Sequence, residues 1–544
     1  MDTRKVFQRI SPRIWILAAI VIVGVFLRTY RFSQWMYFYP DQARDVMLVG
    51  DVLSGRSSWP LLGPIAASTP FQLGPITYYF QIASGALFGV SPWSLAVPDL
   101  CFGILAIPFL FVFLKRILAP ATSLALAGLY AVSFPAVRYS RFAWNSNSIP
   151  FFIILFLLSL SEFLRTKSRT AWAWVVALGV AFGVGIQLHT VLLVSLPLMI
   201  FPTIVFSIRS DPKTWKKWLA VIMIAITLNT GQIVSETRTE FQNTRYFFSV
   251  LDTRSPHESV GLAQNLFLDI VCHAQANALF TSSLPKDDTC ATITSFRYAT
   301  GGYPDRATYL LFLAGIAFGL MVFVAGIILA IHRLRMERDE QKRVFLWTVL
   351  TSATLTFLVM LPVVGHNGQV RYLLPVFFFP FLSLGLIAEY ASRRFPGKFR
   401  LLLPVFILII LIALNVSTIV SEAQLSAAGI RSNAQYIILD ELEAVRDAII
   451  SESAPAPEAY LYGGEKYMQN YLKPLIYSSS QENFTILKGR RDIGTVPAGK
   501  PVFFIAQSLD TSVVSEYNAS PEAFGLTVES YRGVGNIGIY GIRH

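Results

Sequence analysis

The sequence predicts an α-helical polytopic membrane protein of about eleven spans, in a range of ten to thirteen. We expect juxtamembrane helices on its outer face and a small soluble α/β domain at the C-terminus. Of the 544 residues, 54% are hydrophobic and 14% are charged, whereas soluble domains carry about 25% charged residues. Apolar runs of about 20 residues, the length that crosses a bilayer, recur through residues 1–420. This composition excludes a soluble enzyme, a disordered protein and a fibrous protein.

The apolar runs begin at about Ile14, Ser94, Ala119, Ser148, Ala171, Val191, Trp218, Thr308, Val344, Tyr372 and Leu401. Four basic residues precede the first run, and no small-residue cleavage site follows it. We therefore expect an uncleaved anchor with its N-terminus in the cytoplasm.

Basic residues between the runs set the direction of each span. With eleven spans, every strongly basic connection falls on the cytoplasmic side, as the positive-inside rule requires. Residues 75–90 are apolar but short, and counting them as a span would place each later basic loop outside. We therefore interpret them as a re-entrant or interfacial helix on the outer face. The net charge of +12 then reflects loops held at an anionic membrane surface rather than binding to nucleic acid.

This topology divides the chain into a membrane domain, residues 1–420, and a soluble exoplasmic domain, residues 421–544. The membrane domain has a first outer loop at 32–93 and a long outer loop at 236–306. In the C-terminal segment, short apolar runs alternate with Gly, Pro and Asn, a pattern typical of strands and turns. Cys272 and Cys290 both lie in the long outer loop, where they either form a disulfide or remain two free thiols.

Asp41 is the first candidate for chemistry, because polar groups at a membrane face are costly and tend to be functional. Arg44 and Asp45 follow it at helical spacing. Asp41 either caps a helix that starts there or accepts a proton as a general base. Asp45 is expected to be solvated or paired with Arg44.

Further cations stand on the outer face, where the charge rule does not place them. The polar candidates in these segments are Arg138, Arg141, Asn145, His189, His366, Arg371 and Tyr372. The planar fork of an arginine suits phosphate oxygens, although the same side chains could snorkel toward lipid headgroups and the histidines could be packing residues. A cationic surface facing one carboxylate suits an anionic lipid headgroup together with a hydroxyl that must lose its proton.

Several common motifs are missing from the sequence. It has no Gly-rich nucleotide loop, no zinc motif of the His-x-Glu type, no Cys-x-x-Cys and no Gly-x-Ser-x-Gly elbow. A nucleotide-driven pump or a metallohydrolase therefore has no support.

Three motifs resemble those of the GT-C superfamily of membrane glycosyltransferases, family 39 type, which includes protein O-mannosyltransferases and the lipid A aminoarabinose transferase. Asp41-Gln-Ala-Arg44 is similar to the Asp-Glu-Ala-Arg of the first outer loop in that family. Tyr139-Ser-Arg141 and Arg371-Tyr372-Leu-Leu-Pro resemble two later segments. The resemblance covers about residues 10–420 in layout.

The resemblance implies an inverting transfer of a sugar from a polyprenyl-monophosphate donor to an acceptor hydroxyl of a lipid, glycan or protein. It implies that Asp41 is the base and that Arg138, Arg141 and Arg371 hold the phosphate, while His189 contacts donor or acceptor. Gln42, Arg44, Asn145, His366 and Tyr372 complete the expected substrate-binding set. The expected location is the plasma (inner) membrane of a prokaryote, with the active site and the C-terminal domain extracytoplasmic.

The sequence departs from the family at two positions. Gln42 stands where relatives usually have Glu, and a neutral amide cannot be a second base or an anionic metal ligand. We therefore expect no required cofactor, and a divalent metal has little support. A basic residue is also missing before Pro75, where Leu73 and Gly74 stand.

Two rival functions remain open at this stage. A flippase or secondary transporter of lipid-linked sugar would place coupled charges near the bilayer midplane and often has repeated halves, and no repeat is visible here. A catalytically inactive scaffold is the other rival, and Gln42 keeps it open.

Overall fold

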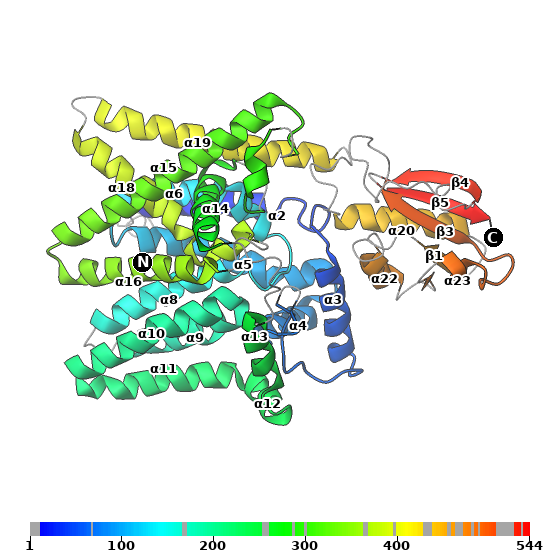
Figure 1. Cartoon of the computed structure of the whole chain (residues 1–544), viewed down its shortest axis with the longest axis horizontal. Helices are drawn as coiled ribbons and strands as arrows, with labels where there is room; N and C mark the ends of the chain where they lie inside the picture. The colour runs from blue at the N-terminus through cyan, green and yellow to red at the C-terminus, as the bar shows by residue number, and fades with distance from the viewer. Residues whose placement is uncertain are drawn as a thin grey trace, which may run out of the picture.

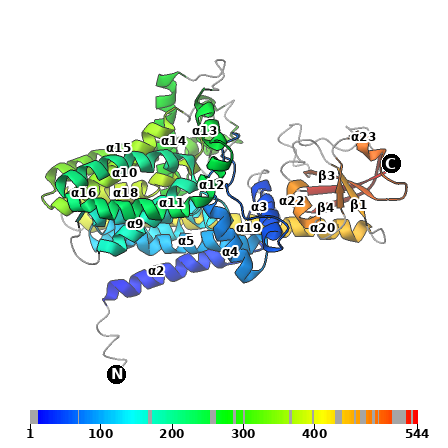
Figure 2. The same ribbon diagram turned by 90° about the horizontal axis from the view of Figure 1, so that it is seen from below.

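The computed structural model has a large helical bundle and a smaller α/β domain at one end of it (Figure 1). It describes residues 11–66, 69–165, 171–252, 261–284, 289–298, 302–362, 368–394, 399–427, 438–453, 458–462, 472–479, 484–487, 490–507, 527–534 and 537–543. Most of the long helices of the bundle run roughly along its length, whereas α14 runs across it (Figure 1 and Figure 2). The bounds of the long helices are α2 (Pro12–Thr29), α5 (Pro92–Leu114), α6 (Pro120–Val132), α8 (Ile149–Arg165), α9 (Ala171–Leu188), α10 (Thr190–Ser210), α11 (Trp215–Leu228), α14 (Leu262–Ser282), α15 (Arg306–Met336), α16 (Glu340–Met360), α18 (Phe378–Arg394) and α19 (Phe399–Ala427).

The protein is a multi-pass membrane protein. Among the described residues, six helices are long and apolar enough to cross a membrane, namely α2, α5, α10, α15, α16 and most of α19. Two bent pairs raise this number to eight if each pair is one span: the helical segment ending in α11 with α12 (Thr230–Arg238), and η4 (Val370–Val376) with α18. The helices α6 and α9 are apolar but shorter, so the count of eleven stays a prediction.

Proline and capping side chains mark where several helices begin. A proline occupies the first turn of α2, α5 and α6, where its missing N–H costs no hydrogen bond. The Asp305 carboxylate accepts a hydrogen bond from the Thr308 N–H, 2.8 Å away, at the start of α15. These residues therefore explain why the four helices begin where they do.

Short helices gather at the end of the bundle that faces the α/β domain (Figure 2). They are α3 (Pro40–Leu53), α4 (Ile76–Phe88), α7 (Phe134–Tyr139), α12 and α13 (Gln242–Asp252). The segment expected to be re-entrant or interfacial is α4, which has 13 residues and packs against α3, α5 and α9. Its inward face is buried by these neighbours, so it behaves as part of the protein core at this end.

The expected outer loop 236–306 contains a long helix, α14. The C-terminal half of α14 is buried, and the helix packs against α15 and α18. Its polar residues lower its hydropathy, which explains why the sequence indicated a loop. The structure joins Cys272 of α14 to Cys290 in a disulfide, with their Cα atoms 5.0 Å apart. The remaining described helix of this segment is η3 (Ile293–Phe296).

The C-terminal segment forms a five-stranded sheet with the order β2-β1-β3-β5-β4. The β1 strand pairs in parallel with β2 and β3, whereas β5 pairs antiparallel with β3 and β4. The elements of this domain are α20 (Leu439–Ser453), β1 (Ala459–Tyr462), α22 (Lys473–Ser479), β2 (Phe484–Ile486), α23 (Arg490–Ile493), β3 (Val502–Gln507), β4 (Thr527–Val534) and β5 (Ile537–Arg543). The bundle also contains the short helix η1 (Pro212–Thr214).

The α/β domain is attached to the segment that leads into α3. The Leu439 N–H donates to the Met36 carbonyl oxygen, 2.9 Å away, and the rings of Phe38 and Tyr477 lie 5.7 Å apart. Phe38 is fully buried and shares one apolar cluster with both the bundle and Leu442 of α20. This contact fixes the chain immediately before Asp41.

Candidate active site

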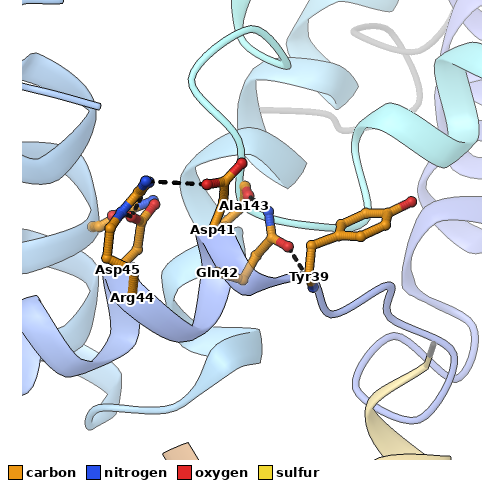
Figure 3. A network of polar contacts seen from close by, with 7 residues as sticks. Tyr39, Asp41, Gln42, Arg44, Asp45 and Ala143 are labelled. Carbon is orange, nitrogen blue, oxygen red and sulfur yellow. Dashed lines mark hydrogen bonds and ion pairs between the residues drawn. The ribbon is translucent and has the colours of Figure 1, made fainter. Parts of the chain in front are cut away.

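The helix α3 begins at the candidate base. Tyr39 is its N-cap, Pro40 is the first helical residue and Asp41 lies in the first turn, where a negative charge is favoured by the helix dipole. The side-chain oxygen of Gln42 accepts the Tyr39 N–H at 2.7 Å, and its nitrogen donates to the Ala143 carbonyl at 2.6 Å (Figure 3). Gln42 therefore caps α3 and ties it to the loop 140–148.

Arg44 lies between two carboxylates on α3 (Figure 3). Its Nη1 is 3.0 Å from Asp41, while its Nε and Nη2 donate to one oxygen of Asp45 at 3.0 and 2.7 Å. The Asp41 side chain is 50% exposed and that of Asp45 is 5% exposed. The accessible carboxylate is therefore the one able to meet a substrate.

Burial and charge act in opposite directions in this cluster. Burial raises the pKa of Asp45, and Arg44 opposes this increase. Burial lowers the pKa of Arg44, but Asp45, Tyr78 and Asp41 outweigh it and raise that pKa above its ordinary value. Burial and Asp45 raise the pKa of Tyr78. Arg44 is therefore a permanent cation, and Tyr78 is a neutral hydroxyl.

Arg141 has a different partner from the predicted phosphate. Its Nη1 donates to the carbonyls of Leu27 and Arg28 at 3.0 and 3.1 Å, and its Nη2 to those of Tyr30 and Arg31 at 2.9 and 3.0 Å. Leu27 and Arg28 lie in the last turn of α2, whose carbonyls have no partner within the helix, and Tyr30 and Arg31 follow its end. The Arg31 carbonyl also accepts the Trp35 N–H at 3.1 Å. Burial lowers the pKa of Arg141 to about 10, which leaves it charged at neutral pH. In this structure Arg141 holds the end of α2.

The Asn145 side chain likewise forms a hydrogen bond with a backbone carbonyl. Its side-chain nitrogen donates to the Leu188 carbonyl at 2.6 Å, which ties the loop 140–148 to the end of α9. The Asp99 carboxylate accepts the Trp144 N–H at 3.0 Å and the Ser148 hydroxyl at 2.5 Å. These bonds fix the loop so that Trp144 keeps one orientation.

Two of the predicted arginines flank a row of aromatic rings. We call Tyr37, Tyr39 and Trp144 the aromatic ledge, whose neighbouring ring centroids lie 6.2 and 6.3 Å apart. Arg138 stands 4.9 Å from the Tyr37 ring, and Arg371 stands 4.1 Å from the Trp144 ring. Tyr39 is also the N-cap of α3, so the ledge runs from Arg138 to Arg371 past the start of the helix that carries Asp41.

His189 and Tyr372 lie beside Arg371. The rings of His189 and Tyr372 are 5.1 Å apart, and the Arg371 guanidinium lies 5.5 Å from the Tyr372 ring. Burial and the charge of Arg371 lower the pKa of His189 to about 4, so its imidazole is neutral at pH 7. Its Nδ1 accepts the Val191 N–H at 3.2 Å, and it caps α10. His366, the remaining candidate, lies outside the described residues.

The missing basic residue before Pro75 has a steric reason. A Cβ added to Gly74 would lie 2.3 Å from the Gln187 side chain, whose oxygen accepts the Ile76 N–H at 3.1 Å. No side chain fits at residue 74 unless Gln187 moves. The polar group that stands here is therefore an amide from α9.

The sequence did not single out three residues that complete the site. The Arg371 guanidinium stacks over the Trp144 ring, and the Asp99 carboxylate accepts the Trp144 N–H. Gln81 donates to the second oxygen of Asp45 at 3.2 Å. Gln81 and Asp99 are isolated polar residues in apolar segments, which is the signal that could have identified them. Within the described ranges, no three His, Cys, Asp or Glu side chains are placed to hold a metal ion.

Comparisons with known proteins concern the fold and the family resemblance of this chain. Residues 70–230 match the family model Dolichyl-phosphate-mannose-protein mannosyltransferase. The fold is similar to that of ArnT from Cupriavidus metallidurans bound to undecaprenyl phosphate, at a TM-score of 0.51 and 12% identity over 97% of both chains. The resemblance to GT-C glycosyltransferases of the family 39 type is confirmed.

Other similarities are weaker. The apo state of the same ArnT aligns over 97% of both chains at 14% identity with a TM-score of 0.42. The protein O-mannosyltransferase Pmt1-Pmt2 complex of S. cerevisiae, bound to the sugar donor, matches 43% of this chain and 34% of that chain at 14% identity, with a TM-score of 0.34. No curated protein matches this chain.

Proposed function

We propose that this protein is an inverting glycosyltransferase. It moves a sugar from a polyprenyl-monophosphate donor to an acceptor hydroxyl at the extracytoplasmic face of a prokaryotic plasma (inner) membrane. The observation that carries the proposal is a half-exposed carboxylate, Asp41, in the first turn of a helix whose N-cap belongs to the aromatic ledge. Arg138 and Arg371 stand at the two ends of that ledge. The similar ArnT structure is bound to undecaprenyl phosphate, which supports a lipid-phosphate donor.

In the proposed reaction, Asp41 takes the proton of the acceptor hydroxyl. The acceptor oxygen forms a bond to the anomeric carbon on the side opposite the phosphate. The bond from that carbon to the phosphate oxygen breaks, and its electron pair leaves with the polyprenyl phosphate. Arg371 and Arg138 stabilise the negative charge that grows on this leaving group.

The neighbouring residues set the geometry for this step. The Arg44 guanidinium fixes the Asp41 carboxylate, and Gln42 fixes the helix that carries it. His189 is neutral at pH 7, so it contributes a hydrogen-bonding group rather than charge. A phosphate-linked sugar already has a good leaving group, so one base and cationic stabilisation suffice without a required cofactor.

A flippase or secondary transporter of lipid-linked sugar is less well supported. Such proteins place coupled charges near the membrane midplane. Here α3, which carries Asp41 and Arg44, lies at the end of the bundle that faces the α/β domain (Figure 1).

The test uses purified full-length protein in lipid nanodiscs with a panel of polyprenyl-phosphate sugars. We expect one donor to be consumed, and we expect Asp41→Asn to slow transfer by about 10²- to 10⁴-fold, the usual contribution of a general base. Asp51→Asn, at an exposed ion pair on the same helix, is the matched control and should transfer normally. A folded Asp41→Asn protein with near-normal transfer would remove Asp41 from the mechanism.

A further inference from the structure

Arg44 distributes its hydrogen bonds unequally between its two carboxylates. Two nitrogens donate to Asp45 and one donates to Asp41. Asp45 is buried while Asp41 is half exposed. The buried partner therefore holds the guanidinium, and the accessible partner receives only part of its charge.

Asp45 is itself held from a second helix. Gln81 of α4 donates to the carboxylate oxygen that Arg44 does not touch, at 3.2 Å. Among the residues that the structure describes, Tyr78 from α4 and Asp99 from α5 also interact electrostatically with this cluster. Of these groups only Arg44 is cationic, so the charge on Arg44 is balanced mainly by Asp45 and Asp41.

A general base works less well when a cation holds it firmly in the ionised form. If Asp41 were the only partner of Arg44, the full positive charge would stabilise its carboxylate and weaken its ability to take a proton. A second carboxylate that shares Arg44 reduces this effect, and it also keeps the guanidinium in one place.

We propose that Asp45 is a positioning residue, anchored by Gln81, which holds Arg44 and balances its charge so that Asp41 remains an effective base. This inference rests on the proposed function, because it assigns a role within the same site. It adds a buried residue that touches neither donor nor acceptor and acts only through Arg44.

The principal test is Asp45→Asn, which keeps the shape of the side chain and removes its charge. We expect kcat to fall roughly ten-fold and KM for the donor to change less than about two-fold, since the Asp45 side chain is buried against Arg44 and Gln81. The acid limb of the pH–rate profile should move to lower pH, because loss of a negative charge leaves Arg44 to stabilise the ionised base more strongly. A merely structural role would lower the melting temperature without moving this limb.

Two further variants test the direction in which the acid limb of the pH–rate profile moves. Gln81→Met removes one hydrogen bond to Asp45 and should move the acid limb the same way by a smaller amount, so it serves as the test if Asp45→Asn does not fold. Arg44→Gln removes the cation and should move the limb to higher pH. Asp51→Asn alters an exposed ion pair, 2.8 Å apart, between the last turn of α3 and Arg56, which follows the helix. It should leave the acid limb where it is in wild type.

A measurement without turnover separates this inference from the proposed function. The infrared carboxylate band of Asp41, identified by its loss in Asp41→Asn, should titrate at lower pH in the Asp45→Asn protein than in wild type. If no donor is consumed but this shift occurs, the proposed function fails and the charge balance stands. If folded Asp45→Asn protein titrates and turns over like wild type, the role assigned to Asp45 is wrong.

Discussion

At the scale of single residues, Gln42 shows what an amide can do that a carboxylate cannot. Its oxygen accepts the Tyr39 N–H while its nitrogen donates to the Ala143 carbonyl. An ionised carboxylate can only accept. An amide at residue 42, where relatives usually have Glu, can therefore donate to a carbonyl group in the loop 140–148. In this chain Gln42 links α3 to that loop.

The first prediction is that Gln42→Glu destabilises the protein at neutral pH. The new side chain would place a negative charge against the Ala143 carbonyl in a buried position, which we expect to cost about 1–3 kcal/mol. The melting temperature and the transfer rate should both fall. The loss should shrink as the pH falls, because the protonated acid regains a donor for Ala143.

Gln242→Glu is the matched control for this prediction. The Gln242 amide donates to the Tyr246 hydroxyl at 2.7 Å on an exposed surface, where water can replace the lost bond. Thermal unfolding of both variants between pH 5 and 8 checks the result. A Gln42→Glu protein as stable as wild type at pH 8 would contradict the assigned role.

The arginines show how far sequence reasoning can reach at this scale. The sequence identified Arg138, Arg141 and Arg371 by the same argument, namely cations where the topology does not want them. In the structure, Arg141 caps α2, while Arg138 and Arg371 stand over aromatic rings. The sequence could single out these cations by their type and position. The end of α2 that Arg141 caps lies more than 100 residues away, and no local pattern encodes that contact.

At the scale of elements, the hairpin that precedes α4 is held by close backbone approach. The Gly63 N–H donates to the Leu73 carbonyl at 2.8 Å, and the Leu73 N–H to the Pro64 carbonyl at 3.0 Å. Asn243 of α13 accepts the Gln72 N–H at 2.8 Å and donates to the Gln72 carbonyl at 3.0 Å. Glycine at 63 and 74 lets the two strands and α9 meet without side chains between them.

The second prediction is that Gly74→Ala disrupts this element. The added methyl group would lie 2.3 Å from the Gln187 side chain, so Gln187 must move and lose its bonds to Ile76, Gly183 and Leu228. We expect a stability loss of about 1–3 kcal/mol, typical of overpacking. Gly261→Ala, where nothing lies within 4 Å of the new atom, should be tolerated in the same thermal assay.

Equal stability of the two glycine variants would mean that residue 74 has room for a side chain. The sequence registered the absent basic residue at this place but could not explain it. The reason is a contact between the first outer loop and α9, and sequence separation hides such contacts.

At the scale of the whole molecule, the α/β domain and the bundle meet at the approach to α3. The Tyr37 and Ile438 backbones form an antiparallel bridge, and Phe38 is buried against Tyr477 of α22. The sequence predicted a separate soluble domain. It did not predict that the domain would contact the segment leading to Asp41, because a docking surface has no periodicity of its own.

The third prediction is that Phe38→Ala loosens this attachment. Removing a buried aromatic ring costs about 3–5 kcal/mol, and here the loss falls on the contact between the two parts. We expect faster release of the C-terminal domain on limited proteolysis together with slower transfer. Phe248→Ala, at a side chain that is 58% exposed, is the control, and unchanged proteolysis of the Phe38→Ala protein would contradict the docking role.

The disulfide connects covalent maturation to the placement of Arg371. Next to Cys290, the Thr289 backbone bridges Gln369, and the Cys290 N–H donates to the Gly368 carbonyl at 2.9 Å. Cys272 anchors this short pairing to α14, and Arg371 follows two residues later. Oxidation of these two thiols therefore secures the segment that leads into η4, the short helix that carries Arg371. Disulfide formation thus becomes a step in the maturation of the region around Arg371.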